Sequence, residues 1–98
     1  MWKEMTNSAI LEEIGQRLKD TRLRKNIQQK ELAERCGISL PSVQRVEKGS
    51  VVSMETLVSV MRGLGLLENF EQLLPEAPIS PLLMKKLKGK MRKRAGNK

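Results

Sequence analysis

Four residues between positions 41 and 48 have side chains and spacing suited to reading a nucleic acid. They follow one another at i, i+3, i+4 and i+7, which places them on one face of a helix. They are Pro41, Gln44, Arg45 and Lys48. Arginine can donate two hydrogen bonds to guanine O6 and N7, and glutamine can pair with adenine through two hydrogen bonds. Leu40 or Pro41 could contact a thymine methyl group, so this face suits the major groove of DNA.

The same four positions also fit an ordinary surface helix. Val43 and Val46 lie between them and would face a core, so the polar side chains could simply form the solvated side of an amphipathic helix. Charged residues are common on such a side. The choice between the two interpretations depends on the rest of the chain.

Catalytic chemistry has little support in the sequence. The chain has no histidine, the side chain most used in acid-base catalysis and as a metal ligand. Its glycines continue into neither a dinucleotide fingerprint nor a phosphate loop. We therefore expect no enzyme activity, no metal and no cofactor. The single cysteine, Cys36, cannot form an internal disulfide, and we interpret it as a small core residue because no cationic neighbour is evident in its motif.

The sequence predicts a cytoplasmic protein that does not associate with a membrane, and the DNA-binding interpretation would place it with the nucleoid. No stretch reaches the roughly 18 apolar residues that a membrane span requires. Near the N-terminus, Glu4, Glu12 and Glu13 surround a short apolar stretch, unlike an export signal.

The positive charge is concentrated at one end of the chain. Residues 1–74 contain 11 Lys and Arg against 10 Asp and Glu, whereas residues 75–98 contain 8 Lys and Arg against Glu76 alone. Pro75, Pro78 and Pro81 separate the two parts, because proline disfavours helix in its own position and in the preceding one. We expect a domain at 8–74, a Pro-rich hinge at 75–81 and a basic arm at 82–98.

Within the domain, apolar residues recur with helical spacing and predict an all-α bundle of five helices. The expected helices span about 8–25, 28–36, 39–48, 53–65 and 66–74. Ser8, Ser39 and Ser53 are the expected N-caps. Asn26 stands where the chain turns out of the first helix, a position that favours residues tolerating positive φ.

The stretch from Ile14 to Gly49 resembles the DNA-binding domain of phage Cro and CI repressors and of Xre-type bacterial regulators. Three segments carry the resemblance: Ile14, Gly15, Leu18 and Arg22; Gln28, Gln29, Lys30, Glu31, Leu32 and Ala33; and Gly37, Ile38, Ser39, Val43, Glu47 and Gly49. With the following helices it covers residues 8–74 and implies a lambda-repressor-like bundle that contains a helix-turn-helix. The chain departs from the family at Gln28, where Thr or Ser is the usual N-cap, and we expect a weaker start to the second helix. It also has Asn26 in place of the commoner Gly.

The resemblance assigns roles to particular residues. Gln29 matches a glutamine that contacts phosphate and supports the recognition helix. Arg22 and Glu47 match an ion pair between the first and third helices. The positions that match DNA-facing residues are Ser39, Leu40, Pro41, Ser42, Gln44 and Arg45, and the helical spacing adds Lys48 to this face.

Regulators of this type usually engage two half-sites as dimers. Apolar residues cover more of the fifth helix than one core-facing stripe needs, and we expect them to form a homodimer interface. They are Leu66, Leu67, Phe70, Leu73 and Leu74. The alternative is that all five simply close the bundle.

The basic arm has three open interpretations. Its charge could neutralise DNA phosphates through Lys85, Lys86, Lys88, Lys90, Arg92, Lys93 and Arg94. Its apolar residues could instead form a short helix that docks on a protein partner. Adsorption to an anionic membrane is the least favoured, because Gly89 interrupts a small apolar face.

The small size, the lone helix-turn-helix and the LLPEAPISPL hinge also resemble, more loosely, HipB-type antitoxins that accompany HipA-like kinase toxins. This resemblance implies a dimeric autorepressor of double-stranded operator DNA with a toxin partner. A phage-type repressor or a restriction-modification controller without a toxin remains an alternative. A protein-interaction module that uses the arm is an alternative of another class.

Overall fold

The computed structural model describes residues 1–77 and contains a short 3-10 helix at Trp2–Glu4 followed by five α-helices. These are α1 (Asn7–Arg24), α2 (Gln29–Cys36), α3 (Leu40–Lys48), α4 (Met54–Gly63) and α5 (Asn69–Leu73). Residues 1–77 contain no strand, and the predicted all-α five-helix fold is confirmed for this part of the chain. The basic arm at 82–98 lies outside the described residues.

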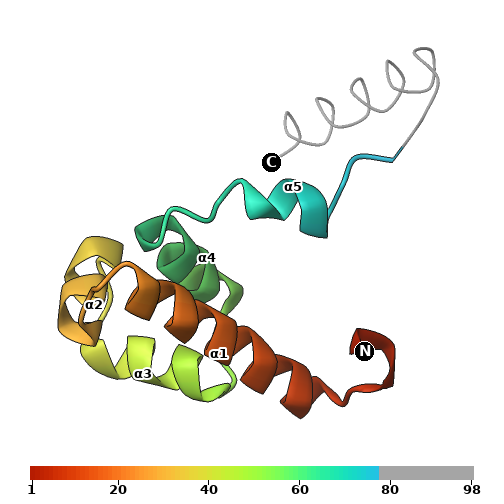
Figure 1. The fold of residues 1–98 in the computed structure, drawn as a ribbon, viewed down its shortest axis with the longest axis horizontal. Helices are drawn as coiled ribbons and strands as arrows, with labels where there is room; N and C mark the ends of the chain where they lie inside the picture. The colour runs from red at the N-terminus through yellow and green to blue at the C-terminus, as the bar shows by residue number, and fades with distance from the viewer. Residues whose placement is uncertain (78–98) are drawn as a thin grey trace, which may run out of the picture.

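The longest helix, α1, lies along the middle of the molecule (Figure 1). It packs against α3, while α2 packs against both α3 and α4. Helix α5 lies beyond α4, away from α2 and α3 (Figure 1). Among the helices of residues 1–77, this arrangement leaves one side of α3 and much of α5 without a neighbouring helix.

The core is aliphatic and lies where α1 to α4 meet. Its buried side chains are Leu18, Ile27, Leu32, Ala33, Val43, Val46, Val60 and Leu64. Full burial of such a Val or Leu side chain contributes about 1.5 to 3 kcal/mol relative to its exposure. The core therefore fixes the inner side of α3, and this determines which of its side chains face solvent.

The predicted N-cap of the first helix, Ser8, is wrong. Thr6 is the cap, because its hydroxyl oxygen accepts a hydrogen bond of 3.1 Å from the backbone N–H of Ala9. Ser39 and Ser53 cap α3 and α4 in the same way, as predicted. Gln28 makes no side-chain cap bond to α2, the difference expected from its departure from Thr or Ser. Asn26 has a positive φ of 59° and turns the chain between α1 and α2.

The fifth helix is shorter than the predicted span of 66–74. Helix α4 ends at Gly63, Gly65 adopts a φ of 73°, and the Leu66 N–H then donates to the Met61 carbonyl oxygen. These contacts turn the chain before α5 begins at Asn69. Only five residues, Asn69–Leu73, are helical.

Candidate nucleic-acid interface

A tight turn joins α2 to α3. Gly37 ends α2 in the left-handed conformation, with a φ of 69°. Ser39 then accepts a hydrogen bond of 3.2 Å from the Ser42 N–H, and the hydroxyl groups of these two serines lie 2.8 Å apart. Pro41 occupies the first turn of α3, where no backbone N–H is needed. These local features fix the angle at which α3 leaves α2.

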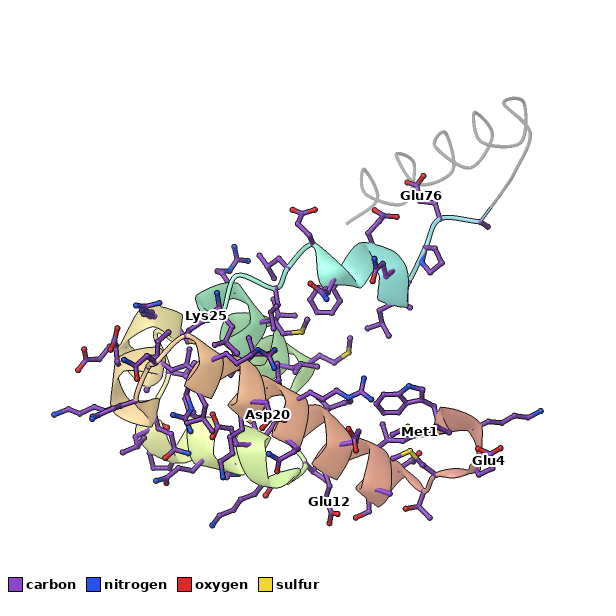
Figure 2. All side chains as sticks on the ribbon, viewed as in Figure 1. Met1, Glu4, Glu12, Asp20, Lys25 and Glu76 are labelled. Atoms are coloured by element: carbon purple, nitrogen blue, oxygen red, sulfur yellow. The ribbon has the colours of Figure 1, made fainter. Side chains whose placement is uncertain are left out.

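Helix α3 has a buried side and an exposed side. Val43 and Val46 are buried in the core. The exposed residues of the helix are Leu40, Pro41, Gln44, Arg45 and Lys48, which we term the α3 outer face. Side chains of α3 project from the side of the molecule turned away from α1 (Figure 2). Of the other expected DNA-facing residues, Ser39 is exposed and Ser42 is half-buried.

Arg45 is held in place by the loop that follows α3. Its Nη2 donates a hydrogen bond of 3.1 Å to the carbonyl oxygen of Val51. The guanidinium group has five N–H donors, so one bond of this kind leaves donors available for a base edge. This contact cannot be predicted from the sequence, because a backbone acceptor in a loop leaves no signal in residue types.

A buried ion pair joins α1 to α3. The Arg22 Nε donates to Glu47 Oε2 at 2.7 Å, and its Nη2 donates to Oε1 at 3.1 Å. The Arg22 Nη1 also donates to the Ile27 carbonyl oxygen at 2.7 Å. Only 7% of the Arg22 side chain and 4% of the Glu47 side chain are exposed. The paired geometry satisfies both groups, and no buried side-chain nitrogen or oxygen in residues 1–77 lacks a partner.

Gln29 extends this network to the start of α2. Its Nε2 donates a hydrogen bond of 2.9 Å to Glu47 Oε1. The side chain is half-buried, at the first residue of α2. The Glu47 carboxylate of α3 is therefore bonded to both α1 and α2, and these two helices hold the α3 outer face in position.

Gly15 allows α1 to approach α3 closely. A Cβ at this position would lie against the Val46 carbonyl oxygen and 2.7 Å from the Glu47 carbonyl oxygen. Backbone atoms cannot move aside as a flexible side chain would. The close contact between α1 and α3 therefore requires a glycine at position 15. The backbone conformation does not, because Gly15 lies within a regular α-helix.

The five expected interface residues of the fifth helix divide into two groups. Leu66, Leu67 and Phe70 are half-buried, and Leu66 packs against the core. Leu73 and Leu74 are 65% and 71% exposed. The basic residues predicted for the arm, from Lys85 to Arg94, lie outside the described residues.

Cys36 is half-buried beside the core, with its Sγ 4.0 Å from the Val60 carbonyl oxygen. Burial raises the pKa of its thiol, and the Gly63 backbone hydrogen bond and the charge of Arg35 oppose this effect. Arg35 is therefore a cationic neighbour of Cys36, contrary to the expectation that its motif has none. Desolvation nevertheless dominates and keeps the thiol protonated.

Within residues 1–77, no group of three or more His, Cys, Asp or Glu could hold a metal ion. None of the helices in this part of the chain is long and apolar enough to cross a membrane.

The sequence of this chain matches a known protein family. The family described as helix-turn-helix, of the Xre and Cro/CI type, matches residues 18–68, a little more than half of the chain. The chain belongs to this family. A comparison with curated proteins found no match. The family's helix-turn-helix is a DNA-binding domain, and in this chain the matched residues include the whole of α2, the turn and α3.

Proposed function

We propose that this helix-turn-helix protein is a transcriptional regulator that reads a specific double-stranded DNA sequence with the α3 outer face. The observation that supports this most is that one side of α3 is anchored in the core while its other side exposes hydrogen-bond donors to solvent. Gln44, Arg45 and Lys48 face solvent, while Val43 and Glu47 anchor the opposite side. In this proposal Arg45 and Gln44 contact base edges, and Lys48 contacts phosphate or a base.

Gln29 has two roles in the proposal. Its bond to Glu47 supports α3 from the N-terminus of α2. The free backbone N–H groups at this N-terminus of α2 can also donate hydrogen bonds to a phosphate oxygen. Ser39 and Ser42 at the start of α3 share a hydrogen bond between their hydroxyl groups, which leaves one of the two hydroxyls free to donate to DNA. Leu40 and Pro41 supply apolar contact to a thymine methyl group.

We infer that the regulator acts as a homodimer. One recognition helix covers a half-site, and a two-fold pair covers two half-sites about 34 Å apart. Leu73 and Leu74 are more than half exposed, and within residues 1–77 their segment lies away from α2 and α3 (Figure 1); such exposed apolar area favours a partner. Leu66, Leu67 and Phe70 complete the proposed interface.

The proposed domain spans 8–74, followed by the hinge at 75–81 and the arm at 82–98. The seven expected phosphate ligands of the arm would add salt-dependent affinity without sequence information. We place the protein with the nucleoid in the cytoplasm, since its ligand is DNA. The finer proposal is an autorepressor that also holds a HipA-like kinase toxin, and it is supported by the loose resemblance of the lone domain and hinge.

Fluorescence anisotropy tests the DNA-binding proposal. Three proteins are compared: the wild type, Arg45→Ala and a variant in which Gln replaces every Lys and Arg of the arm. Each is titrated, at several salt concentrations, with DNA from upstream of the protein's own gene and with a scrambled duplex. The proposal expects a preference for upstream DNA that Arg45→Ala removes, and a shallower salt dependence in the neutralised arm. Equal binding to both duplexes that survives Arg45→Ala would contradict it.

Co-purification from native extract tests the toxin partner separately. Recovery of a kinase-sized protein that dissociates on substitution outside α3 supports the antitoxin role. Repeated recovery of the regulator alone favours the phage-type or restriction-modification alternative.

A further inference from the structure

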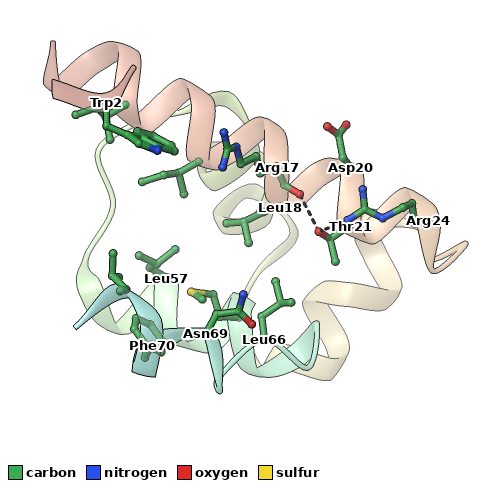
Figure 3. Close-up of a pocket in the computed structure, with 14 residues that line it drawn as sticks. Trp2, Arg17, Leu18, Asp20, Thr21, Arg24, Leu57, Leu66, Asn69 and Phe70 are labelled. Atoms are coloured by element: carbon green, nitrogen blue, oxygen red, sulfur yellow. Dashed lines mark hydrogen bonds between the residues drawn. The ribbon is translucent and has the colours of Figure 1, made fainter. Parts of the chain in front are cut away.

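An apolar groove with a volume of about 650 Å³ lies between α1, α4 and the α5 segment (Figure 3). Trp2 stands on the α1 side and Phe70 on the α5 side, with Leu57 of α4 between them (Figure 3). Leu73 also lines the groove although it is 65% exposed. The core of α1 to α4 is buried without filling this space, so within residues 1–77 the groove is an open apolar surface.

Trp2 is built into the groove wall. The 3-10 helix at Trp2–Glu4 folds the N-terminus back along α1, and the Met1 amino group pairs with Glu4 at 3.3 Å. The Arg17 guanidinium carbon lies 4.7 Å from the centre of the indole ring, within the range of a cation–π contact. Trp2 remains 41% exposed. This arrangement presents a large aromatic face to the groove.

The α1 wall of the groove and the segment that follows α4 differ in charge, although Arg17 of the wall is paired with Glu13 at 2.9 Å and the acidic residues of the segment lie outside the groove lining. The α1 wall carries Arg17 and Arg24, with Asp20 between them (Figure 3). Arg24 donates to the Thr21 hydroxyl at 3.1 Å and forms no ion pair within residues 1–77. The segment 66–77, in contrast, contains three Glu and no Lys or Arg.

This acidic segment also carries the most exposed leucines near the groove. Leu73 and Leu74 follow Glu68 and Glu71, both of which are exposed and form no ion pair in the described part of the chain. An apolar, acidic segment is complementary to an apolar groove with arginines on its wall. Because one chain offers both surfaces, two copies related by a two-fold axis could exchange them reciprocally.

We propose that the groove receives Leu73 and Leu74 of a second copy, and that Trp2 belongs to the dimer interface. The inference rests on the dimeric regulator proposed above and specifies which surfaces meet. Glu68 and Glu71 of each copy then lie near Arg24 of the other. The chain's own arm is a poorer occupant, since seven basic residues between 85 and 94 would approach the same arginines.

A charge exchange between two variants tests the reciprocal contact. Arg24→Glu places acids on both surfaces, and Glu68→Lys/Glu71→Lys places bases on both. Each variant alone is expected to self-associate about tenfold or more weakly in sedimentation velocity, whereas an equimolar mixture regains wild-type affinity because both contacts become attractive. Lys19→Glu, on the exposed side of α1, is the matched control and should stay within about twofold of wild type. Circular dichroism verifies that each variant is folded.

The intrinsic fluorescence of Trp2, the chain's single tryptophan, provides a second measurement. On dilution of the wild type, its emission should shift to longer wavelength with the midpoint found by sedimentation. Two results would overturn the groove contact while leaving dimeric DNA binding intact. One is a dimer whose Trp2 emission wavelength does not change on dilution, and the other is a mixture of the two charge variants that does not regain wild-type affinity. A chain that stays monomeric at every concentration overturns it too. An emission shift caused by removing charge from 82–98 instead would place the arm in the groove and also overturn the proposal.

The two proposals fail in different ways. Specific DNA binding in the proposed function depends on Arg45, which lines no part of the groove. Equal binding of the wild type to all duplexes would contradict the proposed function, whatever the self-association of the charge variants.

Discussion

Glu47 of α3 accepts two hydrogen bonds from the Arg22 guanidinium of α1, at 2.7 and 3.1 Å, and both side chains are buried. The pair carries its charge into the core, where an unpaired charge is costly. Gln29 donates to the same carboxylate. A single acidic side chain therefore joins the buried valines of α3 in holding the α3 outer face in its orientation.

Glu47→Ala is expected to lower the free energy of unfolding by about 3 to 5 kcal/mol, since it leaves the buried Arg22 without its partner. Thermal unfolding followed by circular dichroism measures the loss. Glu31→Ala is the matched control, because Glu31 pairs with Arg35 on the exposed side of α2. Its cost should stay below about 0.5 kcal/mol. An unchanged melting temperature for Glu47→Ala would contradict a structural role for the pair.

Gly15→Ala is expected to destabilise the fold by about 1 to 3 kcal/mol, because the new Cβ meets the backbone of α3. Alanine favours helix over glycine by about 1 kcal/mol, and the clash must outweigh that gain. Lys19→Ala, at an exposed position of α1, provides the comparison. Urea titration should separate the two variants. A stabilised Gly15→Ala protein would show that α1 and α3 can separate without cost.

Arg45→Ala is expected to weaken binding to the preferred duplex by about 1 to 3 kcal/mol and to relax the preference at one base position. Arg45→Lys keeps the charge but loses the planar pair of donors, so it should restore little of the preference. Lys48→Ala should weaken binding more evenly across sequences if Lys48 contacts phosphate. A panel of duplexes with single base-pair changes distinguishes these patterns. Identical patterns for Arg45→Ala and Lys48→Ala would remove Arg45 from base recognition.

Cys36 is expected to react slowly with iodoacetamide, because burial raises the pKa of its thiol and the thiolate is the reactive form. The folded protein keeps this proton over a pH range in which the unfolded chain loses it. The contribution of Cys36 to stability is therefore present below the unfolded pKa and is lost as the pH rises through the folded pKa. Alkylation rates against pH, with and without urea, give the two pKa values. Arg35→Ala should raise the folded value further, and a folded value at or below the unfolded one would contradict the burial effect.

Much of the helical framework could be predicted from local signals. Ser39 and Ser53 are caps in the sequence and in the structure, and Asn26 has the positive φ that its position suggested. The sequence does not determine the start of α1, because Thr6, Asn7 and Ser8 are all acceptable caps and only the hydrogen bond from the Ala9 N–H to the Thr6 hydroxyl selects among them. The helical pattern predicts too long a fifth helix because the leucines at 66 and 67 fit it, whereas the Leu66 N–H donates to the Met61 carbonyl oxygen and sets a turn after Gly65.

The candidate site could be predicted only where residue types carry the information. The outward position of Gln44 and Arg45 follows from the helical spacing, and the structure leaves both exposed. The bond from Arg45 to the Val51 carbonyl and the Trp2 wall of the groove depend on how distant segments meet. Any residue could supply the carbonyl at 51, so no pattern in the sequence could have indicated it.

Selection of bound sequences from a pool of randomised duplexes tests the central claim most directly, because the pool contains every candidate half-site and the protein itself selects among them. The wild type is predicted to enrich a two-fold symmetric site with half-sites about one helical turn apart, and Arg45→Ala should lose one conserved guanine position in each half. Binding without enrichment, or an enriched site identical for both proteins, would contradict sequence reading by the α3 outer face.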